Sequence, residues 1–294
     1  MVLVIVLWII TLLAVMAGGF AYSMRVETQL ATSAVERAQG RALAEAGIAY
    51  ALAWQLDAEA QKQWPPNGDA RDWAFGGGRL RIAVINASGL VNLNNAGPDL
   101  LKALLAGADL NGGDQERVAE AIQDWRDLDD DRMPNGAESA EYRAANRPGP
   151  KNTYFESVEE LGSVLGVTPE LYQRLAEVTI PFSYESAVNP EFAPARVLRA
   201  LGLEERAASD FIAARTRAAA EGSPAPTLPP RDGPSLFFAG RSSVYHIAVV
   251  AETVGGTAVE LKAVYDAQIR GAGAVWGSTA AGQSPRRLSW REGR

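Results

Sequence analysis

The sequence predicts an α+β protein in which a long N-terminal helix is joined to an antiparallel sheet, with an all-helical domain inserted into the sheet. Three observations support this prediction. Residues 2–22 contain no charged side chain, alternating apolar runs occur at 79–86 and 244–269, and the segment 87–235 between them has the spacing of short helices. With 47% apolar residues in 294, the chain can build a sizeable core.

Composition excludes several classes of site. There is no cysteine and only one histidine, which rules out thiol nucleophiles, disulfides and multi-histidine metal sites. His246 lies in an alternating apolar run and is predicted to be a packed strand residue without a catalytic role. The formal charge is −7, with acidic residues crowded in 109–141 and basic residues in 286–294. We therefore expect no broad cationic surface for nucleic acid.

The first segment is predicted to cross a membrane. Residues 2–22 would form a helix of about 31 Å, enough to span the apolar core of a bilayer. The apolar run begins at the first residue and continues into helical sequence, which favours a retained anchor over a cleaved signal. We assign residues 1–24 to the transmembrane part.

Beyond Arg25 the helical pattern continues with one apolar face. Apolar or small side chains recur at helical spacing, with charged residues elsewhere. These positions are Val26, Leu30, Ala34, Val35, Ala38, Ala42, Ala46, Ala49, Ala53 and Leu56. The pattern predicts one uninterrupted helix to about Trp64, where Pro65 and Pro66 end it.

The sheet is predicted from both ends of the remaining chain. Residues 79–86 alternate after three glycines, 244–254 and 257–269 form a hairpin around Gly255-Gly256, and 286–291 add a last strand. The predicted domains are therefore the helix and first strand at 25–86, the insertion at 87–235 and the remaining strands at 236–294. Residues 224–234, rich in proline, are predicted to form a stiff linker.

Six short helices are expected in the insertion, at 98–106, 115–126, 157–165, 169–177, 193–201 and 204–220. Two pairs of them share a helix, glycine, helix pattern, around Gly166 and Gly202. The pattern is similar to helix-hairpin-helix or SAM-like units, some of which hold DNA phosphates on the amides of the glycine turn. Cationic residues are sparse near both turns, the nearest being Lys151, Arg174, Arg196 and Arg199, which favours packing or protein contact.

The segment 124–138 is the most chemically specific. Five of the eight residues from Asp124 to Asp131 are aspartates, which repel one another unless a cation bridges them. Counted from Asp127, carboxylates fall at positions one, three, five and twelve, as in an EF-hand calcium loop. The expected Ca²⁺ ligands are Asp124, Asp127, Asp129, Asp131, Met133 through its carbonyl, and Glu138, with Asn135 at the ninth position.

An EF-hand fold is not predicted, because Arg132 takes the place of the turn glycine and no second flanking helix is evident. Magnesium suits this carboxylate-rich loop less well than calcium. The alternative interpretation is a solvated acidic turn without metal. Glu141 is a further acid that could complete a second shell.

The order of these motifs resembles a known family. The motifs are Gly89 to Asn94, Asp124-Trp125-Arg126-Asp127-x-Asp129, Gly136-Ala137-Glu138, Tyr142, Asn152 and Ser157 with Glu160-Leu161. Together with the long helix, which resembles that of type IV pilins, they are similar to the K-type minor pseudopilin of type II secretion. The resemblance implies a pilin-like core, an inserted helical domain with bound calcium, and a place at the pseudopilus tip.

The same resemblance implies a processing pathway and partners. Prepilin peptidase would remove a basic leader, which is not in this sequence, and the mature N-terminus would be methylated. Counted from Met1, the fifth residue is Ile5 where most subunits have glutamate. Arg25, Arg37 and Arg41 would favour a cytoplasmic head by the positive-inside rule, but we expect a leader to outweigh them.

The predicted function is therefore a non-enzymatic subunit that caps or initiates the pseudopilus for export of folded proteins across the outer membrane. We expect a single-pass inner-membrane anchor with a periplasmic head, and the I-type, J-type and major pseudopilins as partners, with no nucleic acid. One alternative is a membrane-anchored DNA-binding or DNA-uptake factor. Another is an anchored hydrolase using Glu138 and Glu141, although no nucleophile-plus-base arrangement accompanies them.

Overall fold

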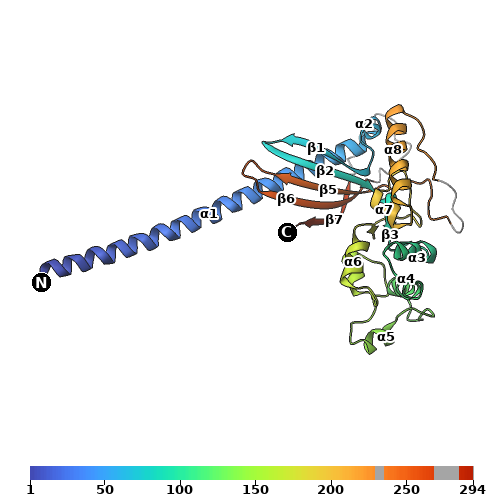
Figure 1. Cartoon of the computed structure of the whole chain (residues 1–294), viewed down its shortest axis with the longest axis horizontal. Coiled ribbons are helices and arrows are strands. Elements are labelled where there is room, and N and C mark those ends of the chain that lie inside the picture. Colours follow the sequence, from blue (N-terminus) through green and yellow to red (C-terminus); the bar gives the residue numbers. More distant parts are fainter. Residues whose placement is uncertain (229–234, 268–284, 294) are drawn as a thin grey trace, which may run out of the picture.

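The computed structural model describes residues 1–228, 235–267 and 285–293. Figure 1 shows a long helix, α1 (Val2–Leu56), whose N-terminal half projects away from a head that contains the rest of the chain. The most apolar 18-residue window of α1 has a mean hydropathy of 2.7 and none of it is buried. Among the described residues, α1 is the one helix long and apolar enough to cross a membrane.

The expectation of one uninterrupted helix to Trp64 is wrong. α1 ends at Leu56 because Asp57 adopts an extended conformation and caps a separate short helix, α2 (Ala58–Gln63). The Asp57 carboxylate accepts hydrogen bonds from the amides of Glu59 (2.9 Å) and Ala60 (3.1 Å). Capping by aspartate satisfies free amides at a new helix start and so competes with continuation of α1.

The head contains a five-stranded antiparallel sheet in the order β1-β2-β5-β6-β7. Its strands are β1 (Asn67–Phe75), β2 (Gly78–Asn86), β5 (Val244–Glu252), β6 (Ala258–Asp266) and β7 (Arg286–Glu292). The predicted α+β fold is confirmed, but β1 was not predicted. The end of the predicted hairpin strand at residues 268–269 lies outside the described residues.

The C-terminal half of α1 packs on one face of this sheet. Ala44, Ile48 and Ala51 are buried against it. The sheet residues of this core include Ile82 and Val249, which lie opposite each other in neighbouring strands and so face the same side. The small side chains along α1 allow the helix to approach the sheet closely.

The chain between β2 and β5 forms the inserted helical domain. Its helices are α3 (Pro98–Gly107), α4 (Gly112–Arg126), α5 (Ser139–Ala144), α6 (Pro169–Ala176), α7 (Ala195–Ala200) and α8 (Glu205–Glu221), with 3₁₀ turns η1 (Ala87–Gly89) and η2 (Val158–Ser163). Two short strands, β3 (Val91–Asn92) and β4 (Thr179–Ile180), pair in parallel. In Figure 1 this domain lies at the end of the head that faces away from the N-terminus of α1.

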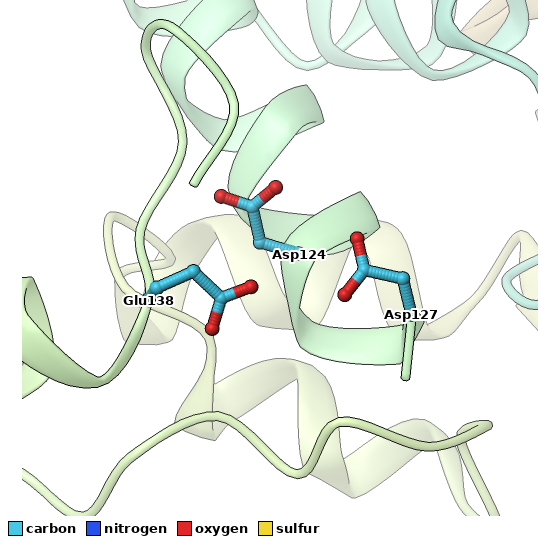
Figure 2. A group of neighbouring side chains, drawn as sticks. All are labelled: Asp124, Asp127 and Glu138. Carbon is cyan, nitrogen blue, oxygen red and sulfur yellow. The ribbon is translucent and has the colours of Figure 1, made fainter. Parts of the chain in front are cut away.

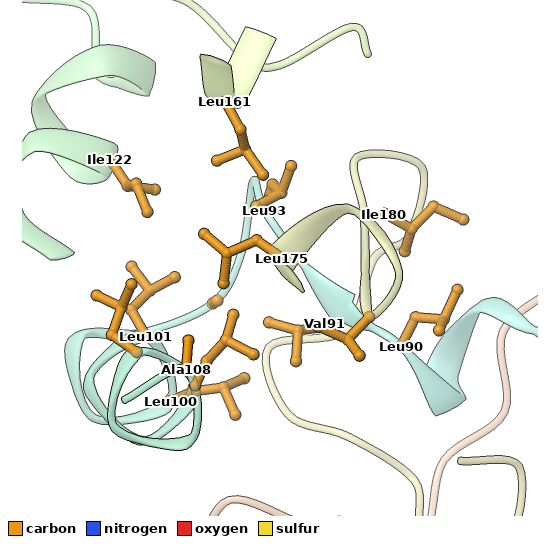
Figure 3. Packing of buried hydrophobic residues seen from close by; sticks show 14 of the residues in the cluster. Leu90, Val91, Leu93, Leu100, Leu101, Ala108, Ile122, Leu161, Leu175 and Ile180 are labelled. Carbon is orange, nitrogen blue, oxygen red and sulfur yellow. The ribbon is translucent and has the colours of Figure 1, made fainter. Parts of the chain in front are cut away.

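A second core holds the helical domain together. Leucines, valines and isoleucines from its helices and from β3 and β4 converge on one cluster. Figure 3 shows Leu93, Leu101 and Leu175 among these residues. The buried members that come from the large sheet are Ile85, Val244 and Val264, and the half-buried Leu288 of β7 packs against this cluster, so the two parts of the head share an apolar contact.

The repeated helix, glycine, helix pattern is present in the structure. Gly166 (φ 89°) joins η2 to α6, and Gly202 (φ 85°) joins α7 to α8. Both adopt the left-handed conformation that glycine accepts without steric cost. The first helix of one pair is 3₁₀ rather than α. Residues 229–234 of the predicted proline-rich linker lie outside the described residues.

Candidate metal centre

Helix α4 positions the first acid of the centre. The helix begins at Asn111, whose side chain accepts a hydrogen bond from the amide of Asp114 (3.0 Å). Ile122 and Trp125 on its inner face join the core of the helical domain, and Asp124 between them is fully buried. At the last turn, the Arg126 guanidinium donates to the carbonyls of Leu93 and Ala96 and holds the end of α4 in place.

The loop after α4 folds back over the helix. The amide of Met133 donates to both carboxylate oxygens of Asp124 at 3.3 Å, and the amide of Asn135 donates to Glu120 at 2.6 Å. Gly136 passes so close to the Asp124 carboxylate that a Cβ on residue 136 would overlap it. A side chain at position 136 would therefore force the Asp124 carboxylate or the loop to move.

This path brings three carboxylates together. Asp124, Asp127 and Glu138 each offer an oxygen, and these oxygens lie within 4.8 Å of one another. Figure 2 shows Asp124 and Asp127 at the end of α4. The Glu138 side chain points toward them from the loop segment that precedes α5. Glu138 is 2% exposed. Neither of its carboxylate oxygens, nor Oδ1 of Asp127, has a hydrogen-bond partner among the described residues.

The electrostatics of this cluster favour a bound cation or bound protons. Burial, followed by the negative charges of Asp124 and Asp127, raises the pKa of Glu138 to about 8. Burial also raises the pKa of Asp124 to about 6, against the lowering effect of the amides of Met133 and Ala137. The pKa of Asp127 is raised as well, by burial and then by the charge of Asp129.

The donor set fits a hard divalent cation. Three carboxylates converge here, and buried oxygens of Asp127 and Glu138 have no hydrogen-bond partner among the described residues, which is costly unless a counter-charge reaches them. The donors are all oxygens, which is the ligand type of Ca²⁺ and Mg²⁺. The residues present therefore fit the calcium ion that the resemblance implies.

The other predicted ligands lie differently. Asp129 and Asp131 are exposed, and the amide of Asp131 donates to the Asp129 carboxylate at 3.0 Å. The Met133 carbonyl accepts from the amide of Gly136 (3.1 Å). The structure thus gathers Asp124, Asp127 and Glu138 from the predicted set, whereas the roles of Asp129, Asp131 and Met133 stay predictions.

One polar residue that contacts the acidic loop was not predicted as a ligand. Asn152 has a left-handed backbone (φ 48°), and its side-chain amide donates to the carbonyl of Asp129. Its Oδ1 is buried and has no hydrogen-bond partner among the described residues. Asparagine tolerates this backbone conformation better than most residues, which is the signal in the sequence that marks it.

The remaining titratable candidates are occupied by structural contacts. Glu141 accepts a hydrogen bond from the amide of Glu138 (3.0 Å) at the start of α5 and pairs with Arg132 (3.4 Å). His246 is half-buried on β5, and burial, then the charges of Arg196 and Lys262, lowers its pKa to about 4. His246 is therefore neutral at physiological pH.

Comparisons with known proteins match both the insertion and the whole fold. Residues 81–180 match the family described as type II secretion system (T2SS), protein K. A chain in the crystal structure of the GspK-GspI-GspJ complex from the enterotoxigenic Escherichia coli type 2 secretion system is similar over 90% of this chain and 99% of that one. The TM-score is 0.61 and the sequence identity 16%, a likeness of fold. No curated protein matches this sequence.

Proposed function

We propose that this chain, which matches the protein K family of type II secretion systems over residues 81–180, is a minor pseudopilin at the pseudopilus tip. In this role it caps or initiates the filament that exports folded proteins across the outer membrane. It acts by assembly and not as an enzyme. The long apolar helix, the sheet packed on it and the inserted domain support this proposal.

The position of the inserted domain is the observation that carries the tip assignment. Helices in a pilin-like filament run with their apolar N-termini toward the membrane, so the opposite end of the head faces outward. In Figure 1 the helical domain lies at that outer end. A domain of this size there would obstruct a further subunit stacking above it, whereas the N-terminal half of α1 remains free to pack below.

The apolar half of α1 supports a single-pass inner-membrane anchor with the head in the periplasm. The partners that follow from this arrangement are the I-type and J-type minor pseudopilins and the major pseudopilin, with prepilin peptidase as the processing and methylating enzyme. The similar chain comes from a GspK-GspI-GspJ complex, which supports the first two.

We further propose that the carboxylate cluster binds Ca²⁺. Asp124, Asp127 and Glu138 would hold the ion, with Asp129, Asp131 and Met133 as additional candidates from the sequence pattern. The ion supplies positive charge that neutralises buried carboxylates and ties the end of α4 to the start of α5. Its role is therefore to stabilise the loop and the outer surface of the helical domain.

A DNA-binding function is less well supported. Three of the four cationic side chains nearest the two glycine turns are engaged by carboxylates: Arg174 with Asp109, Arg199 with Glu205, and Lys151 with Glu156 and Glu160. The fourth, Arg196, donates to the carbonyl of Glu177 (2.9 Å). These cations already have partners, so phosphate binding at the turns would have to break existing contacts.

Reconstitution tests the proposed function. The full chain, purified in detergent, is mixed with the I-type and J-type minor pseudopilins of the same secretion system and analysed by size-exclusion chromatography with light scattering. A stable complex, together with loss of secretion when the gene is deleted, is expected. Failure to bind either partner, combined with salt-sensitive binding of DNA, would instead favour the nucleic-acid alternative.

A further inference from the structure

An aromatic cluster surrounds one arginine where the edge strand of the sheet meets α1. Arg71 of β1 lies with its guanidinium carbon 4.2 Å from the ring centre of Trp54 on α1 and 5.5 Å from that of Trp64. Trp73, two residues along β1, lies on the same face of the sheet. We call Tyr50, Trp54, Trp64, Arg71, Trp73 and Phe75 the Arg71 cluster.

Arg71 has no carboxylate partner. Within residues 1–228, 235–267 and 285–293, its guanidinium forms no ion pair and no hydrogen bond, and Nη1 is buried without any acceptor. The nearest acid in sequence, Asp72, points to the opposite face and pairs with Arg81 (3.8 Å). The π faces of Trp54 and Trp64 stabilise the charge, but a planar guanidinium with free N–H groups is suited to bidentate binding of a carboxylate.

The cluster lies at an open edge. β1 pairs with β2 on one side and is the terminal strand of the five-stranded sheet as described. An apolar ring also lies exposed at the end of β1, because Phe75 is 47% exposed. An unpaired strand edge, an exposed aromatic ring and an unpaired cation together are features of a protein interface.

The ring geometry argues for a protein carboxylate and against a sugar. Trp73 is stacked between Tyr50 (4.2 Å between ring centres, 11° between planes) and Phe75 (4.6 Å, 17°). Arg71 covers Trp54. A sugar stacks on a free ring face. These contacts occupy both faces of Trp73 and one face of Trp54, whereas the guanidinium still has free N–H groups to bind a partner.

We propose that the Arg71 cluster is a docking surface for a neighbouring pseudopilin head, which places an acidic side chain on the Arg71 guanidinium and an apolar side chain against Phe75. This inference rests on the proposed function and deepens it by locating the contact on β1 and the adjoining end of α1. A partner carboxylate would fill the hydrogen-bonding capacity of a cation that is unpaired within the described part of the chain.

The test measures affinity between the full chain in detergent and the purified I-type and J-type minor pseudopilins, for the unchanged protein, Arg71→Gln and Arg81→Gln. Arg81 is the matched control, because it is an arginine on the neighbouring strand, on the opposite face and already paired with Asp72. We expect Arg71→Gln to weaken binding of at least one partner by about tenfold or more, whereas Arg81→Gln leaves it within about twofold.

Arg71→Lys shows whether a loss of binding comes from misfolding. Lysine keeps the positive charge over Trp54 but cannot form the two parallel hydrogen bonds that a guanidinium makes to a carboxylate. The variant should unfold at the same temperature as the unchanged protein and bind with intermediate affinity. Equal affinity of the unchanged protein and Arg71→Gln for both partners would overturn this docking surface while leaving the proposed function intact. Absence of binding by the unchanged protein would remove the proposed function and this inference with it.

Discussion

At the residue scale, the chemistry of the molecule concentrates in three acids, of which Asp124 and Glu138 are buried and Asp127 is half-buried. The spacing of the acids in residues 127–138 predicted a calcium site. It did not predict which carboxylate oxygens lie close together, because a twelve-position count assumes that the chain follows the path of an EF-hand loop. Asp124 lies outside that count, yet burial on α4 and the return of the loop over it place it at the centre of the cluster. The sequence therefore shows which acids are present, whereas the fold determines which of them lie close together.

Substitution of individual acids separates the loop pattern from the observed cluster. Calcium at one hundred times its Kd should stabilise the folded chain by about 2.7 kcal/mol, since it binds only the folded state. We expect Asp127→Asn and Glu138→Gln to abolish this rise in melting temperature. The matched controls Asp129→Asn and Asp131→Asn remove equivalent charges from exposed positions of the same loop.

If both controls abolish the calcium response as completely as Asp127→Asn, the ion follows the EF-hand spacing and not the cluster. If no variant changes the response, or calcium has no effect on the unchanged protein at millimolar concentration, the loop is a solvated acidic turn.

The raised pKa values predict an unusual dependence on pH. Glu138 binds its proton more tightly in the folded state, with a pKa of about 8 against an ordinary value of 4.5. Its contribution to stability is therefore fully present below pH 4.5 and is lost as the pH rises toward 8. Asp124 adds the same trend between 3.8 and about 6.

Calcium-stripped protein is thus expected to lose stability between pH 5 and pH 8, and calcium should stabilise it more at pH 8 than at pH 6, because the ion displaces protons. Thermal unfolding across this range measures both trends. Glu138→Gln, which cannot ionise, should have a flatter profile in the stripped protein. An unchanged slope in that variant would show that other groups dominate the pH dependence.

At the scale of elements, the contrast between α1 and β1 shows what local patterns reveal. The charge-free segment and apolar stripe of α1 are visible in the sequence because each side chain's environment repeats along the helix. β1 lacks such a signal, since only Asn67 of its nine residues is fully buried and it pairs on one side. Its partner β2 and the rings on α1 supply its stability. The break at Asp57 was likewise missed, because a capping aspartate resembles any other polar residue on a helix surface.

The packing of α1 on the sheet gives a prediction for this scale. Ile48 is 2% exposed and lies among residues of β2, β5 and β6. Ile48→Ala should reduce the free energy of unfolding by about 3 kcal/mol, because it removes buried apolar atoms and leaves a cavity. Denaturant unfolding of the detergent-solubilised chain measures the loss.

Val35→Ala is the control on the same helix. Val35 is 56% exposed, so its truncation should change the stability of the isolated chain by less than about 0.5 kcal/mol. Equal effects of the two substitutions would mean that α1 is not held by the sheet in solution.

At the scale of the whole molecule, the head consists of two cores joined through the ends of two strands. Asn86 at the end of β2 lies opposite Tyr245 near the start of β5, so the entire helical domain enters and leaves between paired neighbours. Among the residues that the structure describes, the core between α1 and the sheet contains none from 87–244. The helical domain is therefore an insertion that the sheet does not need for its own apolar core.

Excision of the insertion tests this organisation. Replacing residues 87–244 by an Asn-Gly turn would close β2 and β5 into a hairpin. We expect the shortened chain to retain a cooperatively unfolding sheet and Arg71-dependent partner binding, but to lose the calcium response and to fail to restore secretion in a deletion strain. Circular dichroism and the binding assay report the first two outcomes. A chain that does not unfold cooperatively would show that the two cores are interdependent.

The sequence by itself determined the class of fold, the membrane-crossing length of α1, the presence of an insertion and the chemical character of the loop. These depend on composition and periodicity, which act over a few neighbouring residues. Only the tertiary structure decided which acids meet, where α1 ends, that β1 exists, and that Arg71 lies on two indoles without a carboxylate. Each of these depends on contacts between segments far apart in the chain, such as Asp124 with Gly136 or Trp54 with Arg71, and no local pattern encodes such a contact.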